Sequence, residues 1–277
     1  MEITARRATP RSGPGGRHVV AVAVALTLLL GAAGVSPAAA RTDDRSKPVL
    51  LVHGYNATSS STSCGANFDT MIAQLRSQGF TGPMVRVGFY SGDYNCDVNL
   101  RSYGSFSDSS SWKQIAKALS HYVSREYTSR GVAVDIVGYS MGGLIGRGAV
   151  WGSQKAESGF APGIDVEDVV TLGTPHNGAA WYSSLCLWGQ CTSLKPGATD
   201  LAWLNQNGNP QGRYGTEFTT VGSNGDSVTP TSSAHYMTIP STNKVTYCCT
   251  PHTGSTNYMH TVTIITRSGA ALTYAAQ

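Results

Sequence analysis

The sequence predicts an α/β fold in which a mostly parallel sheet is covered by helices on both faces. Short apolar segments rich in β-branched residues alternate with longer segments whose apolar residues recur at helical spacing. This alternation is typical of parallel sheets, because a parallel connection needs a crossover that is usually a helix. A serine between glycines directly follows one apolar segment, which predicts a site at the carboxyl ends of the strands.

Six short apolar segments are the expected strands. Gly, Pro or polar residues bound most of them, and this favours buried strands over helices. They are residues 48–52, 84–90, 132–137, 166–172, 217–221 and 244–249.

Helices are expected between these strands. Two segments carry an apolar helical face, formed by Phe68, Met71, Ile72 and Leu75 in the first and by Trp112, Ile115, Leu119, Tyr122 and Val123 in the second. A third helix is expected directly after Ser140, and a short Ala-rich helix over residues 269–276. The polar segments 91–111 and 176–214 are expected to be loops or insertions.

Residues 1–40 have the pattern of a secretory signal peptide, and residues 41–277 are expected to form a single domain. Four arginines precede an apolar run over residues 19–30, and small residues up to Ala40 offer a cleavage site. A retained membrane anchor is the alternative, but the run is short for a membrane span. We therefore expect a secreted, extracellular protein without stable membrane insertion.

The net charge excludes one class of partner. The full chain carries +4, of which the four arginines and Glu2 of the leader account for +3, so about +1 remains on residues 41–277. No basic patch with interleaved aromatic residues is present, so a nucleic-acid partner is not expected. We expect a monomer.

All six cysteines lie in the expected domain: Cys64, Cys96, Cys186, Cys191, Cys248 and Cys249. An even number in an exported chain favours disulfides, and proximity in the sequence favours the pairs 64–96 and 186–191. The adjacent Cys248 and Cys249 could bond each other only through a strained ring. Neither a paired C-x-x-C nor an H-E-x-x-H motif occurs, so no metal site is expected.

The segment Gly138–Gly142 has the pattern of a nucleophile elbow centred on Ser140. An apolar strand precedes it and a helix is expected after it, which would hold the serine hydroxyl in the open at the positive end of that helix. A glycine-rich turn with an incidental serine is the alternative. The His53–Gly54 pair at the end of an earlier apolar strand favours the nucleophile.

A serine nucleophile needs a base, and the base needs a carboxylate that orients it. On this kind of fold the chain order is serine, acid, histidine. Asp226 follows a late strand and small turn residues, so it is the expected acid. Asp200 is an outside candidate, and Asp135 lies within a strand and is more consistent with a structural role.

Two of the seven histidines remain as candidates for the base. His252 follows the last expected strand by three residues, and His260 is placed near the head of the final helix. The sequence favours His260, with His252 as the alternative. The backbone N–H groups of Met141 and Tyr55 are the expected oxyanion-hole donors.

Together these residues resemble a secreted bacterial triacylglycerol lipase of the actinobacterial type, which is lipase class 2 of the α/β-hydrolase superfamily. The matching segments are residues 48–54, 134–143 and 171–178, with the 186–191 stretch, residues 194–197 and Gly225-Asp226. The resemblance implies an α/β-hydrolase fold, hydrolysis of acylglycerol esters, no cofactor, and a triad of Ser140, Asp226 and a histidine.

The expected partner is therefore a lipid or another ester substrate, which the enzyme would meet at an oil–water interface. A short-chain esterase, a polyester depolymerase or an acyltransferase would use the same nucleophile, and a non-catalytic binding protein is the alternative from a different class. Seven apolar residues could line an acyl groove or belong to the core: Leu144, Ile145, Trp181, Leu185, Leu187, Trp188 and Trp203.

Overall fold

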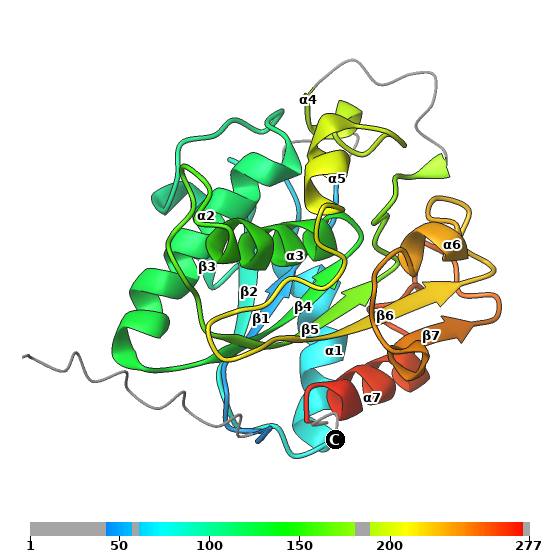
Figure 1. Cartoon of the computed structure of the whole chain (residues 1–277). Helices are drawn as coiled ribbons and strands as arrows, with labels where there is room; N and C mark the ends of the chain where they lie inside the picture. The colour runs from blue at the N-terminus through cyan, green and yellow to red at the C-terminus, as the bar shows by residue number, and fades with distance from the viewer. Residues whose placement is uncertain (1–42, 57–60, 181–188, 274–277) are drawn as a thin grey trace, which may run out of the picture. The chain divides into compact units, whose positions relative to one another are not determined.

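The computed structural model describes residues 43–56, 61–180 and 189–273. The expected signal peptide lies outside these residues, so both it and the domain boundary after residue 40 stay predictions. Within the described residues, seven strands form one parallel sheet in the order β3-β2-β1-β4-β5-β6-β7 (Figure 1). The strand order reverses between β1 and β4, and a crevice for ligands forms at such a point, beyond the carboxyl ends of the strands.

Six of the seven strands occur where the sequence predicts them. The strands are β1 (Val49–Val52), β2 (Met84–Gly88), β3 (Val98–Asn99), β4 (Val134–Tyr139), β5 (Val166–Leu172), β6 (Glu217–Ser223) and β7 (Lys244–Tyr247). The edge strand β3 lies within the segment 91–111, where a loop is expected, because two residues are too short to show a period in the sequence.

The helices that cover the sheet are α1 (Cys64–Ser77), α2 (Trp112–Glu126), α3 (Met141–Gln154) and α7 (Val262–Ala271). Short helices α4 (Gly189–Thr192), α5 (Thr199–Leu204) and α6 (Thr231–Ala234) lie in the connections around β6. The expected helix over residues 269–276 is wrong in its start, because α7 begins at Val262. Its β-branched first turn is a poor helix former, but Ile264 and Ile265 are buried in the cluster that includes α1.

The helices lie in two layers, with α2 and α3 on one face of the sheet and α1 and α7 on the other (Figure 1). Successive side chains of a strand point to opposite faces. In β1, Leu50 and Val52 accordingly pack with α2 and α3, whereas Val49 and Leu51 pack with α1 and α7. Burial on both faces explains why β1 is a continuous apolar run.

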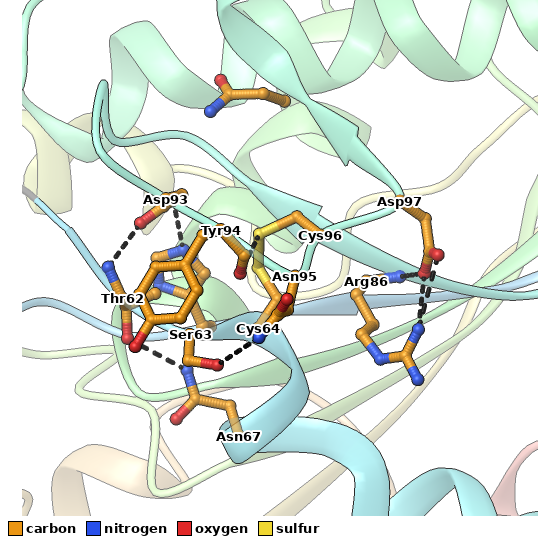
Figure 2. The surroundings of a disulfide bond; sticks show 12 residues. Thr62, Ser63, Cys64, Asn67, Arg86, Asp93, Tyr94, Asn95, Cys96 and Asp97 are labelled. Atoms are coloured by element: carbon orange, nitrogen blue, oxygen red, sulfur yellow. Dashed lines mark hydrogen bonds and ion pairs between the residues drawn. A yellow bond between two sulfur atoms is a disulfide. The ribbon is translucent and has the colours of Figure 1, made fainter.

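Two disulfides occur within the described residues. Cys64–Cys96 joins the start of α1 to the loop between β2 and β3, as the sequence predicts (Figure 2). The adjacent Cys248 and Cys249 are also bonded to each other. The expected Cys186–Cys191 disulfide stays a prediction, because Cys186 lies outside the described residues. None of the helices in the described ranges is long and apolar enough to span a bilayer.

Candidate active site

Ser140 lies at the sharp turn from β4 into α3, at the carboxyl end of the sheet. Its backbone has φ 54° and ψ −123°, a left-handed conformation that residues other than glycine rarely adopt. The turn is held by the Ser140 N–H, which donates to the Leu172 carbonyl at the end of β5 at 2.8 Å. The strand, strained turn and helix form the geometry of a nucleophile elbow.

Glycines let the turn after β1 pack directly against this elbow. A Cβ atom on Gly142 would lie 2.1 Å from the Val52 carbonyl oxygen, and one on Gly54 would lie 2.8 Å from the Ser140 Cβ. Neither separation is possible between real atoms, so both positions require glycine. Gly142 and Gly54 therefore let the turn after β1 lie in contact with the elbow after β4.

A hydrogen-bond chain joins Ser140 to His252 and Asp226. The His252 Nε2 atom lies 2.9 Å from the Ser140 Oγ, and its Nδ1 atom lies 2.8 Å from the Asp226 Oδ2. Because the carboxylate can only accept, Nδ1–H donates to Asp226 and leaves Nε2 to accept from the serine hydroxyl. The imidazole beside Ser140 is thus that of His252, which corrects the preference of the sequence for His260.

The position of the loop after β7 explains why His252 reaches the serine. The Thr250 N–H donates to the Ser223 Oγ at 2.9 Å, and the Tyr139 hydroxyl donates to the His252 carbonyl oxygen, which ties this loop to β6 and β4. His260 instead belongs to the turn that leads into α7, where its N–H donates to the Asn257 carbonyl at 3.1 Å.

Asp226 is held ionised by the groups around it. Its Oδ1 accepts from the N–H groups of Val228 and Thr229, both at 2.8 Å, and its Oδ2 accepts from His252 and from the Tyr258 hydroxyl at 2.8 Å. Burial acts to raise the pKa of Asp226, but the hydrogen bonds from His252, Thr229 and Tyr258 outweigh it and lower the pKa. The carboxylate can therefore orient the imidazole and stabilise its protonated form.

The other acidic candidates lie elsewhere. Asp200 is in the first turn of α5. Asp135 lies near the start of β4, at the opposite end of that strand from Ser140. Its carboxylate lies 3.5 Å from the Lys47 Nζ atom. Neither contacts His252 or Ser140 in the hydrogen bonds of the described residues.

Tyr258 donates a hydrogen bond to Asp226. Nothing in the sequence points to this contact, because the two residues lie 32 positions apart. Burial and the neighbouring carboxylate raise the pKa of Tyr258, so its hydroxyl stays protonated and can donate. Its ring also packs at 6.4 Å from the rings of both Tyr139 and His252.

Replacing Tyr258 with phenylalanine should lower kcat about tenfold, because a hydrogen bond to a charged group contributes roughly 1.5 kcal/mol or more. The ring packing is retained, so the melting temperature should change little. Steady-state kinetics of the purified variant, with the melting temperature as control, test this. An unchanged kcat would show that the backbone N–H groups alone hold Asp226.

The two expected oxyanion-hole residues both lie next to Ser140. Met141 is the first residue of α3, where a backbone N–H has no acceptor within the helix and lies at the positive end of the helix dipole. Tyr55 follows Gly54 after β1 and lines the same pocket as Ser140. Their role as donors stays a prediction.

A pocket of about 450 Å³ lies over Ser140 and His252. The side that follows β1 and enters α1 carries polar residues, namely Asn56, Thr62 and Asn67. The connections after β5 and β6 contribute the apolar residues Pro175, Ala179, Leu194 and Val228, together with Ser227. The pocket lining therefore combines a polar set from the segment after β1 with a mainly apolar set from the connections after β5 and β6.

The residues considered for an acyl groove do not line this pocket where they are described. Leu144, Ile145 and Trp203 are buried in the core on the α2–α3 face of the sheet. The other four, between residues 181 and 188, lie outside the described residues.

Comparisons with known proteins agree with this fold. A family model described as PGAP1-like alpha/beta domain matches residues 44–187. A search of curated protein sequences gives no significant match. Among solved structures, the Bacillus licheniformis lipase BlEst2 in its propeptide form is 18% identical with a TM-score of 0.54, and the match covers 84% of this chain and 51% of that one.

Two further structures are similar. Aspergillus fumigatus lipase B is 15% identical with a TM-score of 0.55, covering 83% of this chain and 53% of that one. The phospholipase PlaB from Legionella pneumophila is 13% identical with a TM-score of 0.58, covering 84% and 61%. The chain thus spans half to three fifths of the length of these three proteins. At such identities the likeness shows the fold, which is the expected α/β-hydrolase fold.

Proposed function

Because the chain belongs to the family of the PGAP1-like α/β domain, we propose that it is a serine hydrolase that cleaves acylglycerol or related lipid esters. The observation that carries the proposal is the hydrogen-bond chain from Ser140 through His252 to Asp226 at a strained elbow. In this chain the serine hydroxyl has a base that can accept its proton, and the base has a carboxylate that orients it, as nucleophilic catalysis requires. A lipase-like and phospholipase-like fold among the structural neighbours supports lipid esters as the substrate class.

The reaction would proceed through an acyl-enzyme. The Ser140 hydroxyl attacks the ester carbonyl while His252 accepts its proton, and the N–H groups of Met141 and Tyr55 stabilise the oxyanion. Protonated His252 then donates to the leaving alcohol, and the acyl group stays on Ser140. A water molecule activated by His252 attacks this acyl-enzyme, releases the fatty acid and restores the serine.

The polarity of the pocket supports an acylglycerol-like substrate. An apolar acyl chain would lie on the side of Pro175, Leu194 and Val228, and a polar alcohol such as glycerol would lie on the side of Asn56 and Thr62. This matches an ester whose two halves differ in polarity. The Cys64–Cys96 disulfide supports action in an oxidising compartment, as a secreted protein would have.

The proposal is tested by labelling the folded chain with a fluorophosphonate and mapping the adduct by mass spectrometry. Modification is expected at Ser140 and should be absent after unfolding, because an isolated serine hydroxyl is a weak nucleophile. Modification of another residue, or none, would overturn the hydrolytic proposal.

A chain-length series of p-nitrophenyl esters, from acetate to palmitate, decides between a lipase and the related enzymes. Hydrolysis of esters longer than hexanoate supports the lipase. A series that ends at hexanoate would leave a short-chain esterase with the same nucleophile, and the assay with an added alcohol as acceptor would reveal an acyltransferase.

A further inference from the structure

Asp93 is a second buried carboxylate near the candidate site, and it is separate from the proposed triad. It lies in the loop between β2 and β3, and its side chain is fully buried. Its Oδ2 accepts from His53 Nε2 at 2.9 Å and from the N–H groups of Phe89 and Tyr90 at 2.7 and 2.8 Å. Its Oδ1 accepts from the Thr62 N–H at 2.8 Å (Figure 2). Four donors from three chain segments therefore converge on one carboxylate.

His53 connects this carboxylate to the expected oxyanion hole. The ring is 1% exposed, its Nδ1 lies 2.9 Å from the Gly54 carbonyl oxygen, and it stacks on Phe89 with centroids 4.0 Å apart. The ring therefore has one orientation. Gly54 packs against the Ser140 Cβ, and the next residue is Tyr55, so any shift of His53 would move the Tyr55 N–H relative to the serine.

The loop that carries Asp93 also forms hydrogen bonds with the chain beyond Tyr55. We call the described residues 53–56 and 61–63 the oxyanion loop and residues 89–97 the clamp loop. Backbone and side-chain groups join the two, through Asn56 N to Tyr90 Oη at 3.0 Å, Ser61 Oγ to Gly92 O at 2.6 Å and Tyr94 N to Thr62 O at 3.1 Å. The Cys64–Cys96 disulfide closes the far end of this contact (Figure 2).

The negative charge of Asp93 matters to this arrangement. Burial acts to raise the pKa of Asp93, but the hydrogen bond and charge of His53 and the N–H groups of Tyr90 and Phe89 outweigh it and lower the pKa. An ionised carboxylate offers only acceptors. An asparagine of the same shape would turn an NH₂ group toward one set of these donors, which leaves buried polar groups unpaired.

We propose that Asp93 is a positioning residue for catalysis: through His53 it fixes the oxyanion loop so that the Tyr55 N–H faces the developing oxyanion. The inference rests on the proposed serine-hydrolase function and adds to it a residue that contacts neither the substrate nor the triad. A misplaced donor weakens binding of the transition state and leaves binding of the ester ground state nearly unchanged. Asp93 should therefore act on kcat rather than on KM.

The test compares Asp93→Asn with Asp97→Asn. Asp97 lies on the same clamp loop, but its bonds go to the N–H and guanidinium of Arg86 at 2.7 and 3.3 Å, and its side chain is 43% exposed (Figure 2). It is therefore a matched control for loss of a carboxylate on this loop. Titration with a fluorophosphonate gives the concentration of competent sites, so each kcat refers to folded protein.

For Asp93→Asn, kcat should fall about 10- to 100-fold, in line with loss or misplacement of an oxyanion donor, while KM changes about twofold or less. The affinity for an alkyl trifluoromethyl ketone, which forms a tetrahedral oxyanion adduct with the serine, should fall in the same proportion. For Asp97→Asn all three quantities should stay within about twofold of the wild type. Equal kcat and ketone affinity in the two variants would overturn the inference.

A pair of His53 variants keeps the test decisive if Asp93→Asn fails to fold. Glutamine can place an amide N–H near the position of the imidazole Nε2, whereas leucine cannot donate. His53→Gln should therefore retain much more of kcat and ketone affinity than His53→Leu, and equal losses would contradict the positioning role. A wild-type chain that does not react with the fluorophosphonate would instead overturn the proposed function itself.

Discussion

Replacing His252 with alanine is expected to lower kcat by about 10⁴-fold or more, whereas replacing His260 with alanine should leave kcat within about threefold of the wild type. The reason is the position of the two rings. His252 lies 2.9 Å from the Ser140 Oγ and 2.8 Å from the Asp226 carboxylate. The described hydrogen bond of His260 is that of its backbone, to Asn257.

The His252 substitution removes the only acceptor that the structure places at the serine hydroxyl among the described residues. Without it the hydroxyl must lose its proton to water, and a serine is a poor nucleophile under these conditions. Residual rate would come from the oxyanion donors and from substrate binding, which is why the loss is large but finite.

Steady-state hydrolysis of a p-nitrophenyl ester measures both variants, and far-UV circular dichroism confirms that each is folded. A second readout is the rate of fluorophosphonate labelling, which should fall in His252→Ala and persist in His260→Ala. The reverse pattern, with His260→Ala inactive, would contradict the assignment of His252 as the base.

The sequence predicts the strand–turn–helix elbow at Ser140 because its signal is local. The elbow needs a strand, a serine between glycines and a helix in immediate succession, and all of these lie within about twenty residues of Ser140. The alternation of apolar strands with helices is also a local signal, and it predicts the parallel sheet. Asp226 is also found locally, because it ends a strand and begins a turn.

The histidine is not found in this way, because its choice depends on the path of a loop. His252 and His260 both follow the last strand, and only the contact of Thr250 with Ser223, together with that of Tyr139 with the His252 carbonyl, brings the earlier one to Ser140. The contacts of Tyr258 with Asp226 and of Asp93 with His53 likewise join residues far apart in the chain. Periodicity carries no information about such contacts.

At the opposite end of the sheet from Ser140, Lys47 is buried among three carboxylates. Its Nζ lies 2.6 Å from Glu167, 3.5 Å from Asp135 and 3.8 Å from Asp168, and all four side chains are at most 7% exposed. Burial acts to lower the pKa of Lys47, but the charges of the carboxylates outweigh it and raise the pKa. Burial and the charge of Asp168 raise the pKa of Asp135 well above its usual value.

Replacing Lys47 with methionine should lower the free energy of unfolding by about 3 to 5 kcal/mol, because it removes the cation that lies among these buried carboxylates. The loss should depend on pH. In the variant, the buried carboxyl groups hold protons more tightly when folded than when unfolded, so the folded state binds more protons and its stability falls as the pH rises. The deficit relative to the wild type should therefore be smaller near about pH 5 than near about pH 8.

Urea unfolding of both proteins at the two pH values measures this difference. The control is Arg130→Met, which removes a cation that pairs with Glu126 at 3.1 Å but is 67% exposed, and it should cost about 0.5 kcal/mol or less at either pH. A Lys47→Met deficit as small as that of the control, or one that grows as the pH falls, would contradict the account. Esterase activity per folded molecule should be retained in Lys47→Met, because the cluster and the serine lie at opposite ends of the strands.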